Sequence, residues 1–405
     1  MKKQDAGLSG LPHELIDAIV DENQDDRATL RACSLVNHSW TYSSQRHIFS
    51  RVSFNNKRTN YFIQRRSQRT IEQFYALICA QPRIATFVQA VEISPLLDVQ
   101  LLARILEKLT RLESISVDLC EYRWDELSLY LRDTLAATLR SPRITNLELR
   151  EGQFLHCTDF LALLGGSGHL KQLTLSGVSC GSFSDSQIRA KNTSGLKLKS
   201  LAISLYEHSH FPLLRLLQSS VNLSSLHRLA VLTAGTGHPG ERVGITKEFL
   251  RRLNGSLLKQ LVLNVCLGEP LSNLIDVSQL RSIRIKLWWM RLDQHTRPSE
   301  WLRWMSAIFR ELVQWHTVEE VTFEIFYASD FTMYIDEWVA LDAVLGRLQS
   351  LRKVHLRLDK YDGARARWRH AREYPGSLED DAKGVLPTLA QKKILFVEVA
   401  ANFPC

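Results

Sequence analysis

The sequence predicts an α/β fold in which a small N-terminal module of three helices precedes a solenoid of parallel strands and helices. Three observations predict it. A short aliphatic motif recurs from residue 88 onward, segments with helical spacing lie between its copies, and residues 8–52 lack the motif but show three short groups at helical spacing. We therefore expect a helical module over 8–52, a linker and N-terminal cap over 53–84, and a solenoid over 85–405.

The first helix of the module is expected to begin at Pro12. Proline at the first helical position gives up no hydrogen bond, and Glu14 places a negative charge near the positive end of the helix. The apolar residues that follow form one stripe at helical spacing, which comprises Leu15, Ile16, Ile19 and Val20.

Two further helices are expected, each after a capping residue. The acidic pair Asp25-Asp26 offers an N-cap for a helix that carries Leu30, and Asn37 offers one for a helix that carries Trp40. Three short helices make a thin core, so apolar residues that the module does not bury would be available to a partner.

The residues of this module resemble the F-box in its fungal form. The resemblance is carried by Leu11-Pro12-His13-Glu14-Leu15, by the segment LRACSLVNHSW over 30–40, and by Arg46-His47-Ile48-Phe49. It implies docking onto the Skp-type adaptor of a Skp/cullin/F-box ubiquitin ligase. The adaptor-binding residues that it implies are Leu11, Pro12, Leu15, Ile19, Leu35, Val36 and Trp40.

Two positions depart from the residues usual in that family. Asn23 stands where leucine is usual, and Asn37 stands where cysteine is common. The polar Asn23 is expected to loosen the helix junction and weaken docking. One alternative is therefore a small helical bundle that binds no adaptor, because amphipathic helices arise easily.

An irregular repeat follows the module. The pattern L-x-x-L-x-L, with other aliphatics or Phe allowed, begins at Val88, Leu112, Ile144, Leu170, Leu198, Leu226, Leu258, Leu280, Val318 and Leu351, at spacings of 22 to 38 residues. Segments with helical spacing lie between the copies, as at 99–109, 127–139, 211–217, 301–313 and 338–348. Each unit is thus expected to be a strand followed by a helix.

This array resembles the leucine-rich-repeat family, although the asparagine ladder of standard repeats is mostly missing. The resemblance implies an irregular horseshoe with parallel strands on its concave face, and the whole chain resembles leucine-rich-repeat F-box proteins. The alternative is an ordinary α/β domain, which would need fewer, longer and more continuously apolar strands. Within the linker we expect one capping helix over 71–80, and we expect a charged loop or insertion over about 360–393 before a last strand at 394–399.

Strand parity predicts which side chains face outward. Early repeats present Glu92, Asp118 and Glu148, whereas later ones present mostly basic groups, interrupted by Glu320 and Glu324. The later face could hold an acidic or phosphorylated target segment. The predicted target-binding residues are Arg228, Arg284, Lys286, Trp288, Lys353, His355 and Arg357. Solvated strand faces are the alternative, and core packing is the alternative for the tryptophans near residue 288.

Bulk properties exclude several classes of function. The net charge is +8, but the basic residues are spread over the whole sequence, which disfavours a nucleic-acid binder. Seven dispersed cysteines without a CxxC pair indicate a reducing compartment. With no signal peptide or apolar run of membrane-spanning length, we expect a cytoplasmic or nuclear location and no membrane partner.

No catalytic or metal-binding motif stands out. Glu207-His208-Ser209-His210 lacks a third ligand at useful spacing, and Gly165-Gly166-Ser167-Gly168 lacks the ending of a phosphate loop and fits a turn before Leu170. We expect no cofactor, no metal and no catalysis. The expected function is that of the substrate-recognition subunit of the ligase, which binds the adaptor, through it cullin, and a target protein. A scaffold or protein-binding repeat protein outside a ligase is the alternative.

Overall fold

The computed structural model describes most of the 405 residues. The described ranges are 11–54, 61–94, 98–119, 122–181, 196–205, 211–233, 239–253, 257–264, 267, 270–288, 298–327, 334–360 and 378–400. Within them no helix is both long enough and apolar enough to cross a lipid bilayer.

Three helices form the N-terminal module, namely α1 (His13–Glu22), α2 (Arg27–Cys33) and α3 (His38–Ile48). Both predicted caps are confirmed. Asp26 accepts hydrogen bonds from the backbone N–H groups of Ala28 and Thr29, and Asn37 accepts from those of Ser39 and Trp40. Helix α1 begins one residue later than predicted, so Pro12 is its N-cap.

The core of the module is small and apolar. Ile16 and Val20 of α1, Leu30 of α2 and Trp40 of α3 are buried together. Leu11, Cys33 and Ile48 pack against them from the margin. One stripe of each helix is thus used for the core, and the remaining apolar residues of α1 point elsewhere.

The chain divides into two compact units, residues 1–196 and 197–405. In the first unit the strands lie side by side in the order β1 (Arg51–Ser53), β2 (Ala90–Ile93), β3 (Ser114–Asp118), β4 (Asn146–Arg150) and β6 (Gln172–Ser176), and β5 (Gln153–Phe154) pairs separately with β7 (Ser179–Cys180). All of these pairs are parallel. The predicted division into a helical module over 8–52, a linker and cap over 53–84 and a solenoid over 85–405 stays a prediction.

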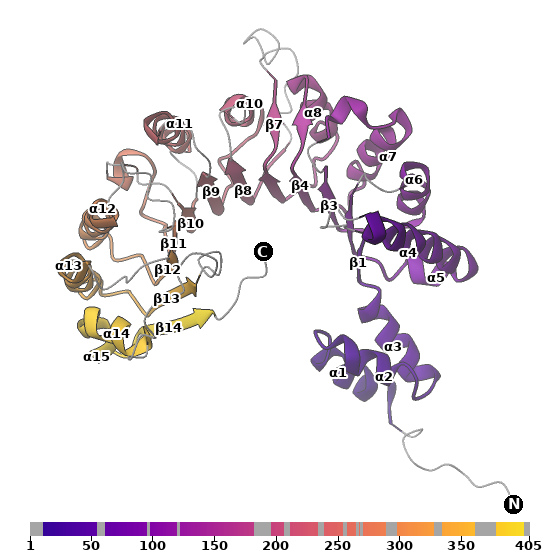
Figure 1. Cartoon of the computed structure of the whole chain (residues 1–405), viewed down its shortest axis with the longest axis horizontal. Coiled ribbons are helices and arrows are strands. Elements are labelled where there is room, and N and C mark those ends of the chain that lie inside the picture. Colours follow the sequence, from indigo (N-terminus) through magenta and orange to yellow (C-terminus); the bar gives the residue numbers. More distant parts are fainter. Residues whose placement is uncertain are drawn as a thin grey trace, which may run out of the picture. The chain divides into compact units, whose positions relative to one another are not determined.

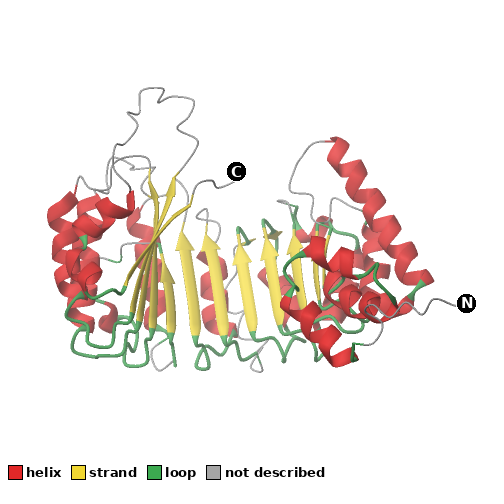
Figure 2. Cartoon of the chain, turned by 90° about the horizontal axis from the view of Figure 1, so that it is seen from below, coloured by secondary structure: helices red, strands yellow, loops and turns green. Residues whose placement is uncertain are grey.

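The second unit continues the pattern. Its strands follow chain order as β8 (Ser200–Leu205), β9 (Arg228–Thr233), β10 (Gln260–Leu263), β11 (Ser282–Trp288), β12 (Glu320–Tyr327), β13 (Lys353–Lys360) and β14 (Leu395–Ala400). Each neighbouring pair is parallel. Figure 2 shows the strand arrows of each unit pointing the same way. The α/β fold with a solenoid of parallel strands is confirmed.

Every predicted repeat start lies two residues ahead of a strand, as Leu170 does for β6 and Leu351 does for β13. The last strand, predicted at 394–399, is β14. Strand β1 was not predicted, because its three residues are too few to carry the motif.

Helices connect the strands and cover one side of them (Figure 1). In the first unit they are α4 (Tyr61–Ala80), α5 (Pro82–Ala85), α6 (Val99–Lys108), the 3₁₀ turn η1 (Trp124–Glu126), α7 (Leu129–Leu139) and α8 (Cys157–Leu164). In the second they are α10 (Phe211–Ser220), α11 (Pro239–Arg251), the 3₁₀ turn η3 (Leu271–Asn273), α12 (Pro298–Leu312), α13 (Ile335–Leu345), α14 (Leu378–Val385) and α15 (Pro387–Gln391).

The core lies between the strands and these helices. In β13, Val354, Leu356 and Leu358 are fully buried, and the residues between them face the opposite side of the sheet. Each such aliphatic side chain contributes roughly 1.5–3 kcal/mol when it leaves water. We call the side of the strands that carries no repeat helix among the described residues the open face.

Two predicted connections differ in detail. The capping helix expected over 71–80 is the second half of α4, which begins at Tyr61. The charged segment expected over about 360–393 contains α14 and α15 near its end, because Leu386 and Leu389 supply apolar residues that are fully buried. Residues 361–377 lie outside the described part of the chain.

A buried carboxylate holds the end of the second unit together. Asp342 of α13 accepts hydrogen bonds from the backbone N–H groups of Thr388 (2.8 Å) and Leu389 (3.0 Å), which lie in the first turn of α15. Asp342 is buried, so water cannot replace these bonds.

Replacing Asp342 by alanine should destabilise the second unit by about 2 kcal/mol, because one buried and one partly buried N–H group lose their acceptor. Amide hydrogen exchange followed by mass spectrometry should show faster exchange in α15 and β14. The matched control is Asp336→Ala, which removes an exposed carboxylate from the same helix. Equal protection in the two variants would contradict this role for Asp342.

Candidate protein-docking surfaces

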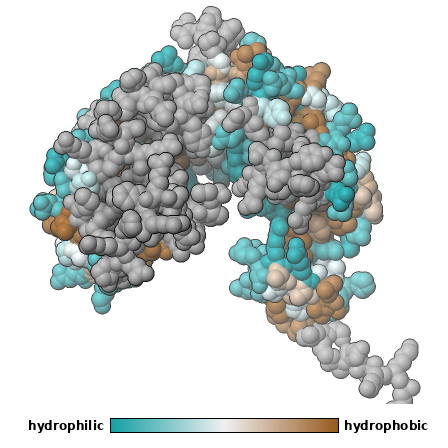
Figure 3. Space-filling model, viewed as in Figure 1, coloured by the Kyte–Doolittle hydropathy of each residue, from teal (hydrophilic) through white to brown (hydrophobic). Residues whose placement is uncertain are grey.

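The N-terminal module exposes large apolar side chains that its own core does not use. Leu15 and Ile19 on α1 are 51% and 41% exposed, and Leu35 and Val36, between α2 and α3, are 86% and 47% exposed. In Figure 3 hydrophobic side chains gather on the visible face of this module. All four residues were predicted to bind an adaptor.

Local structure explains why these side chains point outward. Leu15 and Ile19 lie four residues apart on α1, next to the buried Ile16 and Val20, so that the apolar stripe is wider than the core that it covers. Leu35 and Val36 lie in a turn in which their N–H groups bond the carbonyls of Ala32 and Cys33.

The turn that carries Leu35 is firmly held. The Thr41 hydroxyl donates to the carbonyl of Ser34 at 2.7 Å, and the Asn37 cap fixes the start of α3 directly behind Val36. Exposed apolar groups on an ordered backbone are pre-organised for binding, because little conformational freedom remains to be lost.

The other predicted adaptor-binding residues lie elsewhere in the module. Trp40 is in the core, Leu11 packs on the edge of that core, and Pro12 is an exposed N-cap. Asn23 turns its side-chain amide back onto the carbonyl of Ile19, at 2.8 Å, and so closes the end of α1.

The module joins the first strand directly. Helix α3 ends at Ile48 and β1 begins at Arg51, so no long linker separates them. The carbonyl of Ser50 accepts the N–H groups of Gln89 and Ala90, at 2.8 and 2.9 Å, at the start of β2.

An aromatic contact also joins the N-terminal module to the first repeat. The ring of Tyr42 on α3 meets the ring of Phe87 edge-on, with centroids 5.3 Å apart. Through these contacts the module is fixed to the first repeat inside one compact unit.

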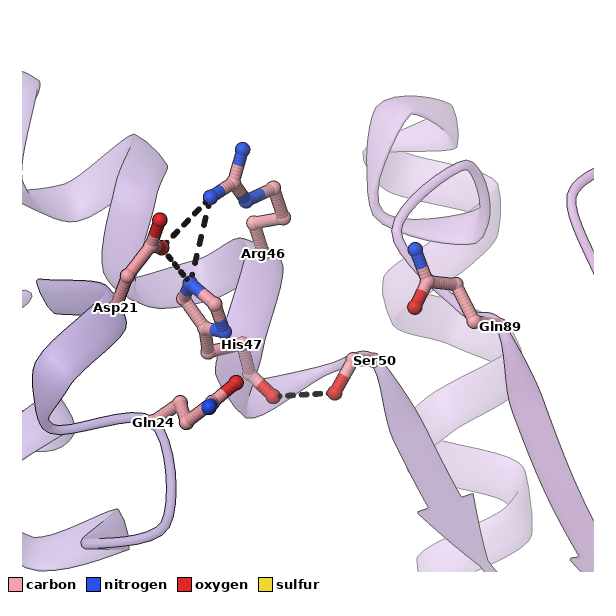
Figure 4. Close-up of a pocket in the computed structure, with 6 residues that line it drawn as sticks. All are labelled: Asp21, Gln24, Arg46, His47, Ser50 and Gln89. Carbon is pink, nitrogen blue, oxygen red and sulfur yellow. Dashed lines mark hydrogen bonds and ion pairs between the residues drawn. The ribbon is translucent and has the colours of Figure 1, made fainter. Parts of the chain in front are cut away.

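A polar cavity of about 390 Å³ lies at this junction, and Figure 4 shows the residues that line it: Asp21, Gln24, Arg46, His47, Ser50 and Gln89. One carboxylate oxygen of Asp21 contacts both Nε2 of His47, at 2.6 Å, and a guanidinium nitrogen of Arg46, at 2.8 Å. The hydrogen bond from His47, together with the charge of Arg46, lowers the pKa of Asp21 below its usual 3.8. This cluster ties α1 to α3 beside the junction.

A second candidate surface is the open face of β11–β14. The register places Arg284, Thr322, His355 and Phe396 in one row across the four strands, and Lys286, Glu324, Arg357 and Glu398 in the next. Glu324 contacts Lys286 at 2.9 Å and Arg284 at 3.4 Å, while His355 contacts Glu398 at 3.2 Å.

The structure therefore brings five of the predicted target-binding residues together. They are Arg284, Lys286, Lys353, His355 and Arg357. Arg228 is exposed on β9, two strands from β11. The side chain of Trp288 lies outside the described part of the chain.

The tryptophans noted near residue 288 are not gathered into one site among the described residues. Trp304 is buried in α12, its ring edge-on to that of Trp301, and Trp315 is partly exposed beyond the end of that helix. Sequence reasoning missed Phe396, which is exposed on β14 in the same row as His355. Its parity within the last strand could have indicated it.

In the described part of the chain, no three histidine, cysteine or acidic side chains converge as metal ligands would. The pair His208 and His210 lies outside the described residues. The glycines around Gly166 form the turn between α8 and β6, as predicted.

Comparison with known proteins finds similarity among solved structures. No family model matches the chain, and no curated protein does. Among solved structures, the chain is similar to one in the crystal structure of the yeast Rad7 and Elc1 complex, with 14% identity and a TM-score of 0.39 over 86% of this chain and 94% of that one. It is also similar to a chain of the TLR13–ssRNA13 complex, with 12% identity and a TM-score of 0.20 over 69% of this chain and 59% of that one. Because both scores are low, the function has to be inferred from the side chains of this chain.

The Asp21 cluster should make the module sensitive to acid. Because the pKa of Asp21 is lowered in the folded state, its contribution to stability is complete above the unfolded value of 3.8 and is lost as the pH falls through the folded value. Asp21→Asn should therefore weaken amide protection in α1 and α3 at about pH 6, and the difference from wild type should be smaller at about pH 3, below the unfolded pKa.

Hydrogen exchange at the two pH values measures this effect, and Asp25→Asn, an exposed carboxylate in the following turn, is the control. A difference between Asp21→Asn and wild type that stays constant across the pH range would contradict an electrostatic role for Asp21.

Proposed function

We propose that the chain is the substrate-recognition subunit of a Skp/cullin/F-box ubiquitin ligase. In this proposal the N-terminal module is an F-box that docks onto the Skp-type adaptor, and the repeats hold a target protein. The observation that carries the proposal is the exposure of Leu15, Ile19, Leu35 and Val36 on an ordered module that has a separate core.

Such a set of residues is suited to a stable protein interface. Complete burial of a large aliphatic side chain contributes roughly 1.5–3 kcal/mol. A few buried residues supply most of the binding energy of an interface. Exposed apolar groups on a small module are otherwise a liability for solubility. A groove of a permanent partner would bury them.

Of the seven residues implied by the resemblance, these four are the proposed contact residues. Pro12, exposed at the start of α1, is a fifth candidate. Leu11 and Trp40 support the interface from within, because they are part of the core or pack against it.

The direct junction between α3 and β1 supports the receptor role. A target held by the repeats would be linked to the adaptor through one chain, in which the module joins the first strand without a long linker. Tethering of this kind raises the effective concentration of a target near the ubiquitin-carrying enzyme that the cullin recruits.

We propose no catalysis, cofactor or metal for the chain itself, and no nucleic-acid or membrane partner. Its proposed location is the cytoplasm or the nucleus, where the ligase would operate. Among the described residues, the charged groups of the open face are offered as protein-binding groups and not as catalytic ones.

Replacing Leu35 by aspartate should abolish co-purification of the full-length chain with the Skp-type adaptor and cullin. The change places a charge at the most exposed apolar position of the module, where adaptor contact would have to desolvate it. Quantitative pull-down from cells that express tagged protein should show a loss of at least about tenfold, which corresponds to roughly 1.4 kcal/mol.

The matched control is Leu129→Asp, which adds the same charge at a leucine of α7 that is 64% exposed. It should leave adaptor binding unchanged, and circular dichroism should show both variants folded. If the wild-type chain recruits no adaptor, the ligase role fails and the chain is a scaffold or protein-binding repeat protein, which Asn23 at the end of α1 would favour.

A further inference from the structure

We infer that the open face of β11–β14 binds an extended target segment with a carboxylate at one position and a large apolar side chain four residues away. The carboxylate lies over Arg284 and Lys286, and the apolar side chain lies against Phe396. This inference rests on the proposed function, because it names the class of target that the receptor would hold.

The part of the surface that would bind the carboxylate is a pre-organised anion site. Arg284 and Lys286 lie two residues apart on β11 and point the same way, so that their charges would repel each other. Glu324 on the neighbouring strand contacts both of them and holds them together. Its side chain is only 9% exposed, whereas that of Arg284 is 43% exposed.

The cationic groups keep donors for a ligand. Arg284 is joined to Glu324 through a single nitrogen at 3.4 Å, which leaves most of its five N–H donors for another partner. A carboxylate in front of Arg284 can accept two parallel hydrogen bonds from the planar guanidinium.

The charge balance favours a single carboxylate over a phosphate. At the anion site, two side chains are cationic and one is anionic: Arg284 and Lys286 against Glu324. One positive charge is in excess. A carboxylate neutralises it, whereas a phosphate monoester, with nearly two negative charges at neutral pH, would leave an excess of negative charge.

Phe396 forms the apolar end. It is 50% exposed on the open face of β14, and the ammonium of Lys353 lies 5.5 Å from its ring centroid. The ammonium covers one face of the ring, so the rest of the ring is available to an apolar or aromatic side chain. Aromatic anchors of this kind are common hot spots.

The spacing of the two ends follows from the strand register. Arg284, Thr322, His355 and Phe396 are aligned on four successive parallel strands. Neighbouring strands lie about 4.8 Å apart, so the row is about 14 Å long, which an extended chain spans in about four residues at roughly 3.3 Å each. Side chains of an extended chain alternate, so residues an even number apart face the same side. A spacing of four residues therefore lets the carboxylate and the apolar side chain of the target segment both face the sheet.

Synthetic peptides test the inference directly. The probe is a seven-residue peptide, Gly-Glu-Ser-Gly-Ser-Phe-Gly, immobilised on a biosensor and exposed to the purified full-length chain at low salt. Binding should exceed that of peptides with the same composition in which phenylalanine follows glutamate by two or three positions instead of four. Replacement of the glutamate by glutamine should weaken binding about tenfold.

Charge exchange provides the decisive variant. Arg284→Glu should weaken binding of the glutamate peptide about tenfold and improve binding of the matching lysine peptide, an outcome that misfolding cannot produce. Arg310→Glu is the control, because it makes the same charge change at an exposed position on helix α12 and should leave both affinities unchanged.

Three results would overturn the inference: equal binding of all spacings, no exchange of preference in Arg284→Glu, or binding of a phosphoserine peptide where the glutamate peptide does not bind. These results are separate from those for the proposed function, because recruitment of the adaptor depends on the N-terminal module and does not require Arg284. If the chain recruits the adaptor but binds none of the peptides, only this inference is wrong.

Discussion

Burial of one side of each short strand is the constraint on which the rest of the structure depends. A single strand and helix cannot bury their own aliphatic side chains, so each repeat needs its neighbour. In β13, Val354, Leu356 and Leu358 are fully buried between neighbouring strands and helices. In β14, Val399 occupies the same side but remains 45% exposed, because no further strand follows it among the described residues. Stability therefore comes from stacking rather than from any one repeat.

The same constraint determines what the open face can display. Because side chains alternate along a strand, fixing the leucines on one side also fixes every intervening residue on the other. In-register parallel pairing then aligns these residues into rows, such as the one from Arg284 to Phe396. Charged and aromatic groups from distant parts of the sequence thereby acquire regular spacings. A repeat fold of this kind can therefore match an extended ligand whose side chains have the same spacing. The residues of the open face can vary without affecting the core.

The N-terminal module buries only part of its apolar side chains. Its helices are too short to bury all of their apolar residues, and the core takes one stripe that includes Ile16 and Trp40. Leu15 and Leu35 are left on the surface. The apolar residues of the module thus divide into two groups. Those on the inner side of each helix form the core, and those on the outer side form the proposed docking surface. The close attachment of α3 to β1 makes this module an extension of the first repeats rather than a separate domain on a tether.

The sequence by itself determined the periodic features: each repeat strand, the caps at Asp26 and Asn37, and the side of the sheet on which each residue lies. These follow from local alternation and from hydrogen bonds within a few residues, which a single sequence displays. Only the tertiary structure decided which apolar residues of the module form its core, that β1 joins the sheet, and that Phe396 lies in a row with Arg284. Such features depend on contacts between residues far apart in the chain, and no local pattern encodes them.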